Sequence, residues 1–196
     1  RSRRTSPSAG AVLFVPDNEG RAMTEPRQMF EPREGERMLA DDPAALPADG
    51  HVVFIGRILS PWTTRESCPK NMRGAREAAR PATLLVDAPY REGLRALDRA
   101  SHLIVRTWLH HAPRNLIVQK PRHAVEAKGV FSLRSPARPN PVGLHVAALV
   151  AIDVETGRID IDAIDVLDGT PIIDIKPYYA STDAFPDAVI AGRDDR

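Results

Sequence analysis

The sequence contains little of what disulfide-bonded, metal-binding and membrane proteins require. Cys68 is the only cysteine among 196 residues, so no internal disulfide can form and a thiolate-rich metal site is excluded. A chain without disulfides suits a reducing compartment, and we expect a cytoplasmic location. The longest apolar runs, such as residues 147–152, are far shorter than the roughly 20 residues of a membrane-spanning helix. We therefore expect no membrane partner.

Motifs for nucleotide binding and for metal binding are also missing. No segment matches the glycine-rich dinucleotide fingerprint or the phosphate-binding loop, and no nucleophile elbow of a serine hydrolase is present. The six histidines show no metal-ligand spacing. His110 and His111 are neighbours, so on a strand their rings would point to opposite faces and would not bind one ion. We predict no metal site.

The charge is distributed unevenly, although the net charge is only +1. Residues 51–140 contain 16 basic and 6 acidic residues, a net charge of +10, whereas residues 141–196 contain 4 and 11, a net charge of −7. A basic block of this size attracts phosphate groups and indicates a polyanionic partner. A solvated arginine-rich surface would give the same composition.

Residues 1–49 differ from the rest of the chain. They are rich in charge and interrupted by six prolines, and only residues 11–15 are apolar. Such a segment buries too little apolar surface to offset its ordering entropy, so we predict a largely irregular extension. Met23 would serve as a natural start, which makes residues 1–22 an upstream extension or a misassigned start. The arginines and serines before Asp17 alternatively suggest an organelle transit peptide.

From residue 51 onward, short apolar runs alternate with loops rich in proline and glycine. The runs are short, are rich in β-branched residues and end at turn residues, which predicts strands. They comprise residues 51–59, 83–86, 103–109, 116–118, 130–133, 144–152, 158–162 and 171–175. The alanine-rich centre of 144–152 would also suit a helix, whereas the polar–apolar alternation of 158–162 is typical of a half-buried strand.

Helical spacing is clear only in residues 92–100, and turns are predicted at residues 153–157 and at Asp168-Gly169, between two strands. Many short strands with few helices favour a closed antiparallel barrel, since closure removes exposed strand edges. We predict a mainly β fold, a small antiparallel β-barrel with few short helices. It occupies residues 50–190, after the extension 1–49 and before a tail 191–196.

Residues 134–143 form the most informative segment. Its three prolines fix φ, so the loop is stiff before a ligand arrives and loses less entropy on binding. Arg134 and Arg138 supply two guanidinium groups, which suit carboxylates or phosphates. A barrel-end loop whose arginines hold neighbouring carbonyls would show the same pattern. Asn140-Pro141 is similar to the Asn-Pro pairs that accept a hydrogen bond from an exocyclic amine in other amino-group methylases.

Together with a second segment, residues 165–178, these residues resemble a known family, the TsaA-like family. The first signature appears as Gly129-Val130-Phe131, Arg134-Ser135, Arg138-Pro139-Asn140-Pro141 and Gly143. The second appears as Leu167-Asp168-Gly169-Thr170-Pro171 and Asp174-Ile175-Lys176-Pro177-Tyr178. The residues Ile55-Gly56, Ser60-Pro61 and Ser101-His102-Leu103 also match. The resemblance covers roughly residues 51–188. On residues alone, the turn at Asp168-Gly169 would equally be a purely structural hairpin.

The resemblance implies a β-barrel methyltransferase that uses S-adenosylmethionine, lies outside the Rossmann-like methylase fold and usually forms a homodimer. The characterised substrate of the family is a threonylcarbamoyl-modified adenosine next to the tRNA anticodon, which is methylated on N6. We therefore expect tRNA and a second copy of the chain as partners. Two alternatives stay open: a methyltransferase of the same fold with a small-molecule or other RNA acceptor, and a non-enzymatic barrel that binds nucleic acid or a ligand.

The resemblance also implies the cofactor contacts. In the family they come from a Pro-Arg-Gln segment, a His-Gln pair, the Arg of Arg-Ser, the residue after the later Gly and the segment before Leu-Asp-Gly-Thr. The matching positions are Pro69, Lys70, Asn71, His110, His111, Arg134, Leu144, Asp162, Ala163, Ile164 and Asp165. Lys70-Asn71 replaces Arg-Gln and His111 replaces Gln. Lysine keeps the charge but lacks the bidentate fork of arginine, so these departures bear on which base is the acceptor.

The charges of S-adenosylmethionine suit these residues. Arg134 would bind its carboxylate, and the aspartate-rich segment would lie near its sulfonium and ammonium groups. An amide-like amine must lose a proton during methylation, and Asp168 and His110 are the candidate catalytic acceptors. The remaining polar residues of the two segments are predicted to contact the substrate; they are Arg138, Asn140, Lys176 and Tyr178.

Overall fold

The computed structural model describes residues 31–122 and 124–191, so the expectations for residues 1–22 lie outside the described residues. The contacts divide the chain into two units. We call Val52–Trp108 with Gly143–Arg196 the barrel unit, and Arg1–His51 with Leu109–Val142 the loop unit. Each unit is described by itself. The predicted domain limits at 49/50 and 190/191 stay predictions.

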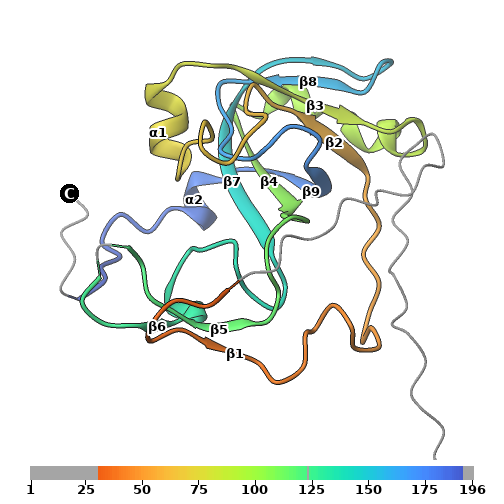
Figure 1. Cartoon of the computed structure of the whole chain (residues 1–196). Helices are drawn as coiled ribbons and strands as arrows, with labels where there is room; N and C mark the ends of the chain where they lie inside the picture. The colour runs from red at the N-terminus through yellow and green to blue at the C-terminus, as the bar shows by residue number, and fades with distance from the viewer. Residues whose placement is uncertain (1–30, 123, 192–196) are drawn as a thin grey trace, which may run out of the picture. The chain divides into compact units, whose positions relative to one another are not determined.

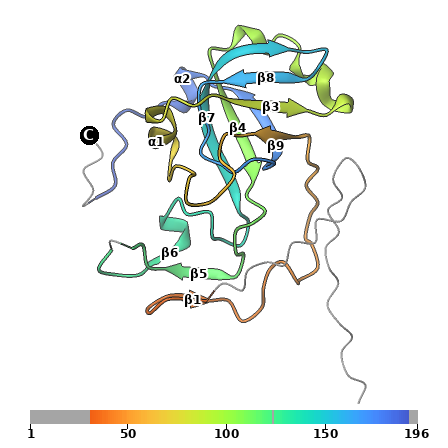
Figure 2. The same ribbon diagram turned by 45° about the horizontal axis from the view of Figure 1, so that its top comes forward.

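The barrel unit contains a closed barrel of six strands. In order around the barrel they are β2 (Gly56–Leu59), β3 (Ala82–Val86), β8 (Arg158–Ile161), β7 (Val142–Asp153), β4 (His102–Trp108) and β9 (Pro171–Pro177). β3 and β8 run antiparallel side by side, as Figures 1 and 2 show. The mainly β fold and the antiparallel barrel are confirmed.

The barrel interior is filled by the inward-facing apolar residues of neighbouring strands. Ile58 lies opposite Leu84, and Leu84 lies opposite Ile159 on the next strand. All three side chains are fully buried, so together they form one layer of the core. The alternation seen in the sequence therefore determines which face of each strand points inward. Among the described residues, no helix is long and apolar enough to cross a membrane.

The predicted turn at residues 153–157 joins β7 to β8. Asp153 Oδ1 accepts hydrogen bonds from the backbone N–H groups of Glu155 and Thr156. Gly157 has φ +75°, and a Cβ there would lie 2.3 Å from the carbonyl oxygen of Val86. Both the backbone conformation and the close approach require glycine. The predicted hairpin is confirmed.

The short helices differ from the prediction. Those of the barrel unit are α1 (Met72–Glu77), η1 (Ala88–Leu94), η2 (Leu97–Arg99) and α2 (Ala180–Asp183). The predicted helix at 92–100 is wrong, because Ala96 adopts a left-handed conformation (φ 61°) that ends one 3-10 helix before the next begins. The predicted strand at 51–59 begins only at Gly56.

The loop unit contains a small sheet of β1 (Arg37–Met38), β5 (Leu116–Gln119) and β6 (Lys128–Gly129). The predicted strand at 130–133 is wrong: Val130–Ser132 forms the 3-10 helix η3, and Val130 is buried with Leu116 and Ala137. The Ser132 hydroxyl donates to the Gly129 carbonyl at 2.8 Å, which stabilises the turn.

A buried carboxylate fastens the described part of the N-terminal extension to β5. Glu36 accepts hydrogen bonds from the guanidinium and the backbone N–H of Arg33 and from the backbone N–H of Lys120. Burial by itself raises the pKa of Glu36, but these hydrogen bonds outweigh it and hold the pKa below its ordinary value. Glu36 is therefore charged at neutral pH and joins two segments that lie far apart in the sequence.

Candidate functional site

The predicted site residues are divided between the two units. The barrel unit contains Pro69, Lys70, Asn71, Leu144, Asp162, Ala163, Ile164, Asp165, Asp168, Lys176 and Tyr178. The loop unit contains His110, His111, Arg134, Arg138 and Asn140. Their assignment to cofactor, substrate or catalysis stays a prediction, and the structure gives the local setting of each group.

Arg138 organises the proline-rich loop of the loop unit. Its guanidinium donates to the carbonyls of Ser135 at 2.9 Å, of Val130 at 2.8 Å and of Leu133. These bonds satisfy backbone groups of a loop whose prolines cannot form a sheet ladder. Arg134 is exposed on the same loop. Arg138 therefore supports the loop through its backbone carbonyls, whereas Arg134 lies at the surface of the loop.

The Asn140 side chain is held by a residue that the sequence did not single out. Arg114 donates through Nε to the Pro139 carbonyl at 2.6 Å and through Nη2 to Asn140 Oδ1 at 3.3 Å. The Leu109 N–H donates to the Pro141 carbonyl at 2.8 Å. The segment 139–141 is therefore fixed from two sides before any ligand binds.

The two neighbouring histidines lie in a turn. β4 ends at Trp108, so the expectation that the rings point to opposite faces of a strand does not hold. The rings of His110 and His111 lie with their centroids 3.8 Å apart at an interplanar angle of 43°. Within residues 31–122 and 124–191, no group of three histidine, cysteine, aspartate or glutamate side chains is placed to hold a metal ion.

The segment Pro69-Lys70-Asn71 leads into α1. Asn71 is the N-cap of this helix, and its side-chain oxygen accepts a hydrogen bond from the Gly74 N–H at 2.9 Å. An asparagine at this position satisfies one of the unpaired N–H groups of the first turn. Asn71 Oδ1 is thus occupied by the cap, and Lys70 is exposed beside it.

The segment Asp162–Asp165 follows β8 and is anchored in the barrel. Asp162 Oδ1 accepts from the Ala148 N–H at 2.8 Å, and Asp162 Oδ2 lies 3.6 Å from Arg76 Nε. Ala163 and Ile164 are fully buried, and the Ile164 carbonyl accepts from the indole of Trp62 at 2.7 Å. Only the two aspartates of the segment are partly exposed.

A buried hydrogen-bond chain supports Asp165. His145 lies between Asp165 Oδ1, 2.6 Å from Nδ1, and the Thr107 hydroxyl, 3.0 Å from Nε2. Thr107 is fully buried, so its hydroxyl cannot attack a substrate. Gly143 makes this arrangement possible, because a Cβ there would lie 2.3 Å from Thr107 Oγ1 and 2.5 Å from His145 Nε2. These hydrogen bonds therefore hold the Asp165 carboxylate in a fixed orientation.

Sequence reasoning missed Thr107, and it also missed His145, for which a signal was present. The alternation of 142–150 places His145 on the same face as Ala147, which points into the barrel. A histidine on an inward face needs hydrogen-bond partners, since burying an unpaired polar group is costly.

Asp168 lies on an exposed turn. Its Oδ1 accepts from the Ser60 N–H at 2.9 Å, and its own N–H donates to the Trp62 carbonyl at 2.7 Å. Gly169 has φ +75°, so the predicted tight turn is present. The hairpin interpretation is wrong, because β8 and β9 are not neighbours in the barrel. The turn instead fastens the connection to the residues that follow β2.

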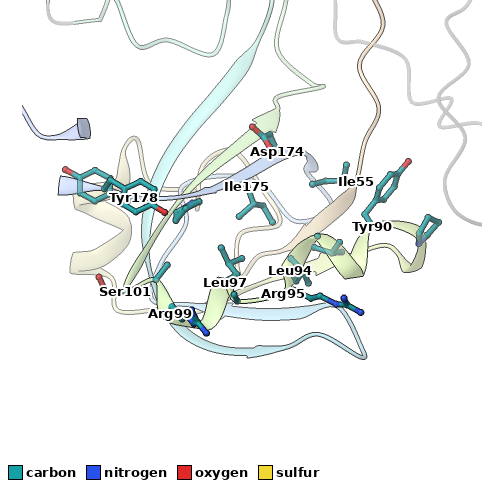
Figure 3. A pocket seen from close by; sticks show the side chains of 17 residues that line it. Ile55, Tyr90, Leu94, Arg95, Leu97, Arg99, Ser101, Asp174, Ile175 and Tyr178 are labelled. Carbon is teal, nitrogen blue, oxygen red and sulfur yellow. The ribbon is translucent and has the colours of Figure 1, made fainter. Parts of the chain in front are cut away.

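The second signature continues along β9 to a cavity. Lys176 pairs with Asp174, with Nζ 3.2 Å from Oδ2. Asp174 and Tyr178 line a cavity of about 990 Å³ within the barrel unit, together with residues of η1 and η2 (Figure 3). Tyr178, one of the predicted substrate residues, therefore borders a cavity of the size of a ligand site.

Comparisons with known proteins identify the family. A family model described as the tRNA-methyltransferase O N-terminal domain matches residues 57–184, which include both signatures. A probable S-adenosyl-L-methionine-binding protein of Methanothermobacter thermautotrophicus is 40% identical over 131 residues, covering 66% of this chain and 90% of that protein. The tRNA (adenine(37)-N6)-methyltransferase of Escherichia coli is 31% identical over 140 residues, covering 68% of this chain and 60% of that enzyme.

The fold agrees with these matches. The crystal structure of TrmO from Pseudomonas aeruginosa superposes with a TM-score of 0.60 at 31% sequence identity, covering 75% of this chain and 64% of that chain. The chain thus spans less than two thirds of the solved protein and of the E. coli enzyme. On the family match and the shared barrel, the chain belongs to the tRNA-methyltransferase O family.

Proposed function

We propose that this protein is an S-adenosylmethionine-dependent methyltransferase that methylates N6 of an adenine in tRNA. The observation that carries the proposal is the family match across 57–184, which contains the arginine–proline loop and the Asp-Gly-Thr-Pro turn. A relative named for this activity on adenine 37 of tRNA is 31% identical over 140 residues.

The residues present fit the chemistry of the cofactor. Arg134 is an exposed residue whose guanidinium suits a carboxylate, and Asp162 and Asp165 keep part of their side chains exposed for cationic groups. Asp165 is preorganised by His145, so its orientation requires no rearrangement on binding. When bound, S-adenosylmethionine supplies the methyl group, which is electrophilic because it is attached to a sulfonium.

The acceptor in this proposal is a threonylcarbamoyl-modified adenosine next to the anticodon. The contribution of the protein to such a displacement is mainly positioning, which can supply up to roughly 7–11 kcal/mol in well-oriented systems. The N6 amine gives up a proton, for which Asp168 in the barrel unit and His110 in the loop unit are the proposed acceptors. Arg138, which holds its own loop, and Asn140 act as positioning groups for the acceptor side.

Two partners belong to the proposal. The basic residues of 51–140 attract the tRNA backbone in the cytoplasm. The other partner in this proposal is a second copy of the chain in a homodimer.

The test is a methylation assay read by nucleoside mass spectrometry. Transfer RNA from cells with and without threonylcarbamoylation is incubated with the protein and S-adenosylmethionine. Methylation only of the modified tRNA supports the proposal, and methylation of both pools or of a different nucleoside contradicts the proposed acceptor. Isothermal titration with the cofactor alone identifies the non-enzymatic alternative, because a non-enzymatic barrel would give no heat even at millimolar concentration.

A further inference from the structure

The cavity of about 990 Å³ in the barrel unit has no role in the function proposed above, apart from its border residue Tyr178. It lies between the 3-10 helices η1 and η2 and the end of β9 (Figure 3). Within the described part of the chain, none of the residues predicted to contact the cofactor lines it. It is therefore a site distinct from the predicted cofactor residues.

The walls of the cavity are apolar at the centre and aromatic at the ends. Leu94 and Leu97 face Ile175 of β9 across the cavity, and Tyr90 and Tyr178 lie at opposite ends (Figure 3). Tyr90 is 38% exposed, so its ring is open to a ligand. Aromatic rings at the two ends of an apolar centre suit ligands that carry flat aromatic groups.

The tyrosines project from a fixed backbone. The Tyr178 N–H donates to the His102 carbonyl at 2.9 Å, and its ring centroid lies 6.4 Å from that of His102. Tyr179, which also lines the cavity, donates its N–H to Asp183 Oδ2 at 2.8 Å while its side chain is exposed. A tyrosine side chain has only two χ angles, so a ring on a fixed backbone loses little conformational entropy when a ligand stacks on it.

Charged groups of both signs border the same cavity. Arg95 and Arg99 come from the 3-10 segment and Asp174 from β9. Arg95 pairs with Glu92 at 2.9 Å, but both side chains are largely exposed, so the pair is weak and a phosphate can replace it. The left-handed Ala96 lies in the wall between these residues and holds a conformation that costs free energy.

We propose that this cavity binds unpaired nucleotides of a single-stranded RNA segment. Bases stack on Tyr90 and Tyr178, Arg95 and Arg99 contact the phosphates, and Asp174 accepts a hydrogen bond from a base amino group. Unpaired bases are recognised in proteins by aromatic stacking combined with arginine, and carboxylates accept from exocyclic amines. The proposal rests on the proposed function in one respect, namely that the substrate is RNA.

The test measures binding without the cofactor and without catalysis. The full chain is titrated into a fluorescent RNA hairpin with an unpaired loop and into a fully paired RNA duplex. Tyr178→Ala and Tyr90→Ala are expected to weaken hairpin binding about 5- to 150-fold each, the effect of one lost base stack. Tyr178→Phe keeps the ring and is expected to retain hairpin affinity, and duplex binding is expected to change in none of these variants.

Charge variants keep the proposal testable if a tyrosine variant fails to fold. Arg99 is exposed, so Arg99→Gln leaves the core intact and is expected to lower the slope of log affinity against log salt by about one unit. The matched control is Arg37→Gln, an exposed arginine of β1 that lies outside the cavity and outside the basic segment 51–140, and it is expected to bind the hairpin like the unmodified protein.

Two results would overturn the proposal. One is hairpin affinity that stays unchanged in folded Tyr90, Tyr178 and Arg99 variants. The other is self-association that Tyr178→Ala abolishes while RNA binding persists, because a second copy of the chain would then occupy the cavity. Failure of methyl transfer with intact hairpin binding would contradict the proposed function and leave this cavity assignment standing.

Discussion

At the residue scale, Arg134 and Arg138 have different settings although they share one loop. Arg138 donates to three carbonyls of the loop, whereas Arg134 is exposed. We expect Arg134→Ala to abolish cofactor binding and leave the fold intact. Calorimetric titration measures the affinity and circular dichroism the fold, with the exposed Arg122→Ala as the matched control of the same unit. Unchanged affinity of the Arg134 variant would remove the central cofactor contact of the proposal.

The buried chain from Thr107 through His145 to Asp165 gives a second prediction at this scale. Thr107→Val keeps the shape of the side chain but leaves His145 Nε2 without its partner at 3.0 Å. We expect the free energy of unfolding to fall by about 1–3 kcal/mol, the cost of an unpaired buried polar group. Chemical denaturation measures this value. Thr107→Ser keeps the hydroxyl and serves as the control; equal losses in both variants would exclude the hydrogen bond as the cause.

At the scale of single elements, the attachment of β1 to β5 depends on the charge of Glu36. A carboxyl whose pKa is lowered in the folded state contributes stability above its unfolded pKa and loses it as the pH falls through the folded value. We expect the attachment to hold at neutral pH and to weaken below about pH 4.5, the ordinary pKa of the group. Hydrogen exchange of the Lys120 amide, corrected for its intrinsic rate, measures the strength of this attachment at each pH.

Glu36→Ala is expected to remove the pH dependence and to expose the Lys120 amide already at neutral pH. The neighbouring Glu34 is exposed, so Glu34→Ala is the matched control and is expected to behave like the unmodified chain. Protection of the Lys120 amide that survives Glu36→Ala would show that another contact holds the segment.

Elements whose apolar and polar residues alternate clearly were predictable from the sequence, and elements without such an alternation were harder to predict. Residues 158–162 alternate apolar and polar side chains, and Arg158–Ile161 forms a strand whose inward face is buried. The alanine-rich residues 144–152 have no such clear alternation and would also have suited a helix, but they form part of a strand. The run 130–133 has four residues, too few to distinguish a strand from the 3-10 turn that buries Val130. β1 has two residues and depends on Glu36, which no local pattern reveals.

For the whole molecule, the charge pattern predicts how RNA binding responds to salt. Residues 51–140 carry a net charge of +10. We expect tRNA affinity to fall steeply between low and physiological salt, with a slope of about −0.7 to −0.9 per phosphate contact, because binding releases counterions. The affinity for S-adenosylmethionine is expected to change little over the same range. Equal salt dependence for both ligands would contradict a role of the basic residues in holding the RNA backbone.

Family and barrel were predictable for the molecule as a whole, because the two signatures are long and the strands are short and regular. The residues that hold the site side chains in place were harder to predict from the sequence. Arg114, which holds Asn140, and Thr107, which holds His145, act over long sequence separations, 26 and 38 residues. Such contacts arise only when the chain is folded, so a single sequence carries no local signal for them.

The burial of Cys68 has a practical consequence for experiments on the two units. The thiol is 7% exposed, and burial, reinforced by the Asp165 carboxylate against the opposing effect of Arg65, raises its pKa. We expect it to react slowly with maleimides at neutral pH, which a thiol-labelling time course followed by mass spectrometry would check. A cysteine introduced on each unit would then carry a dye selectively in the otherwise natural sequence. Energy transfer between two such dyes would report whether the distance between the barrel unit and the loop unit changes on RNA binding.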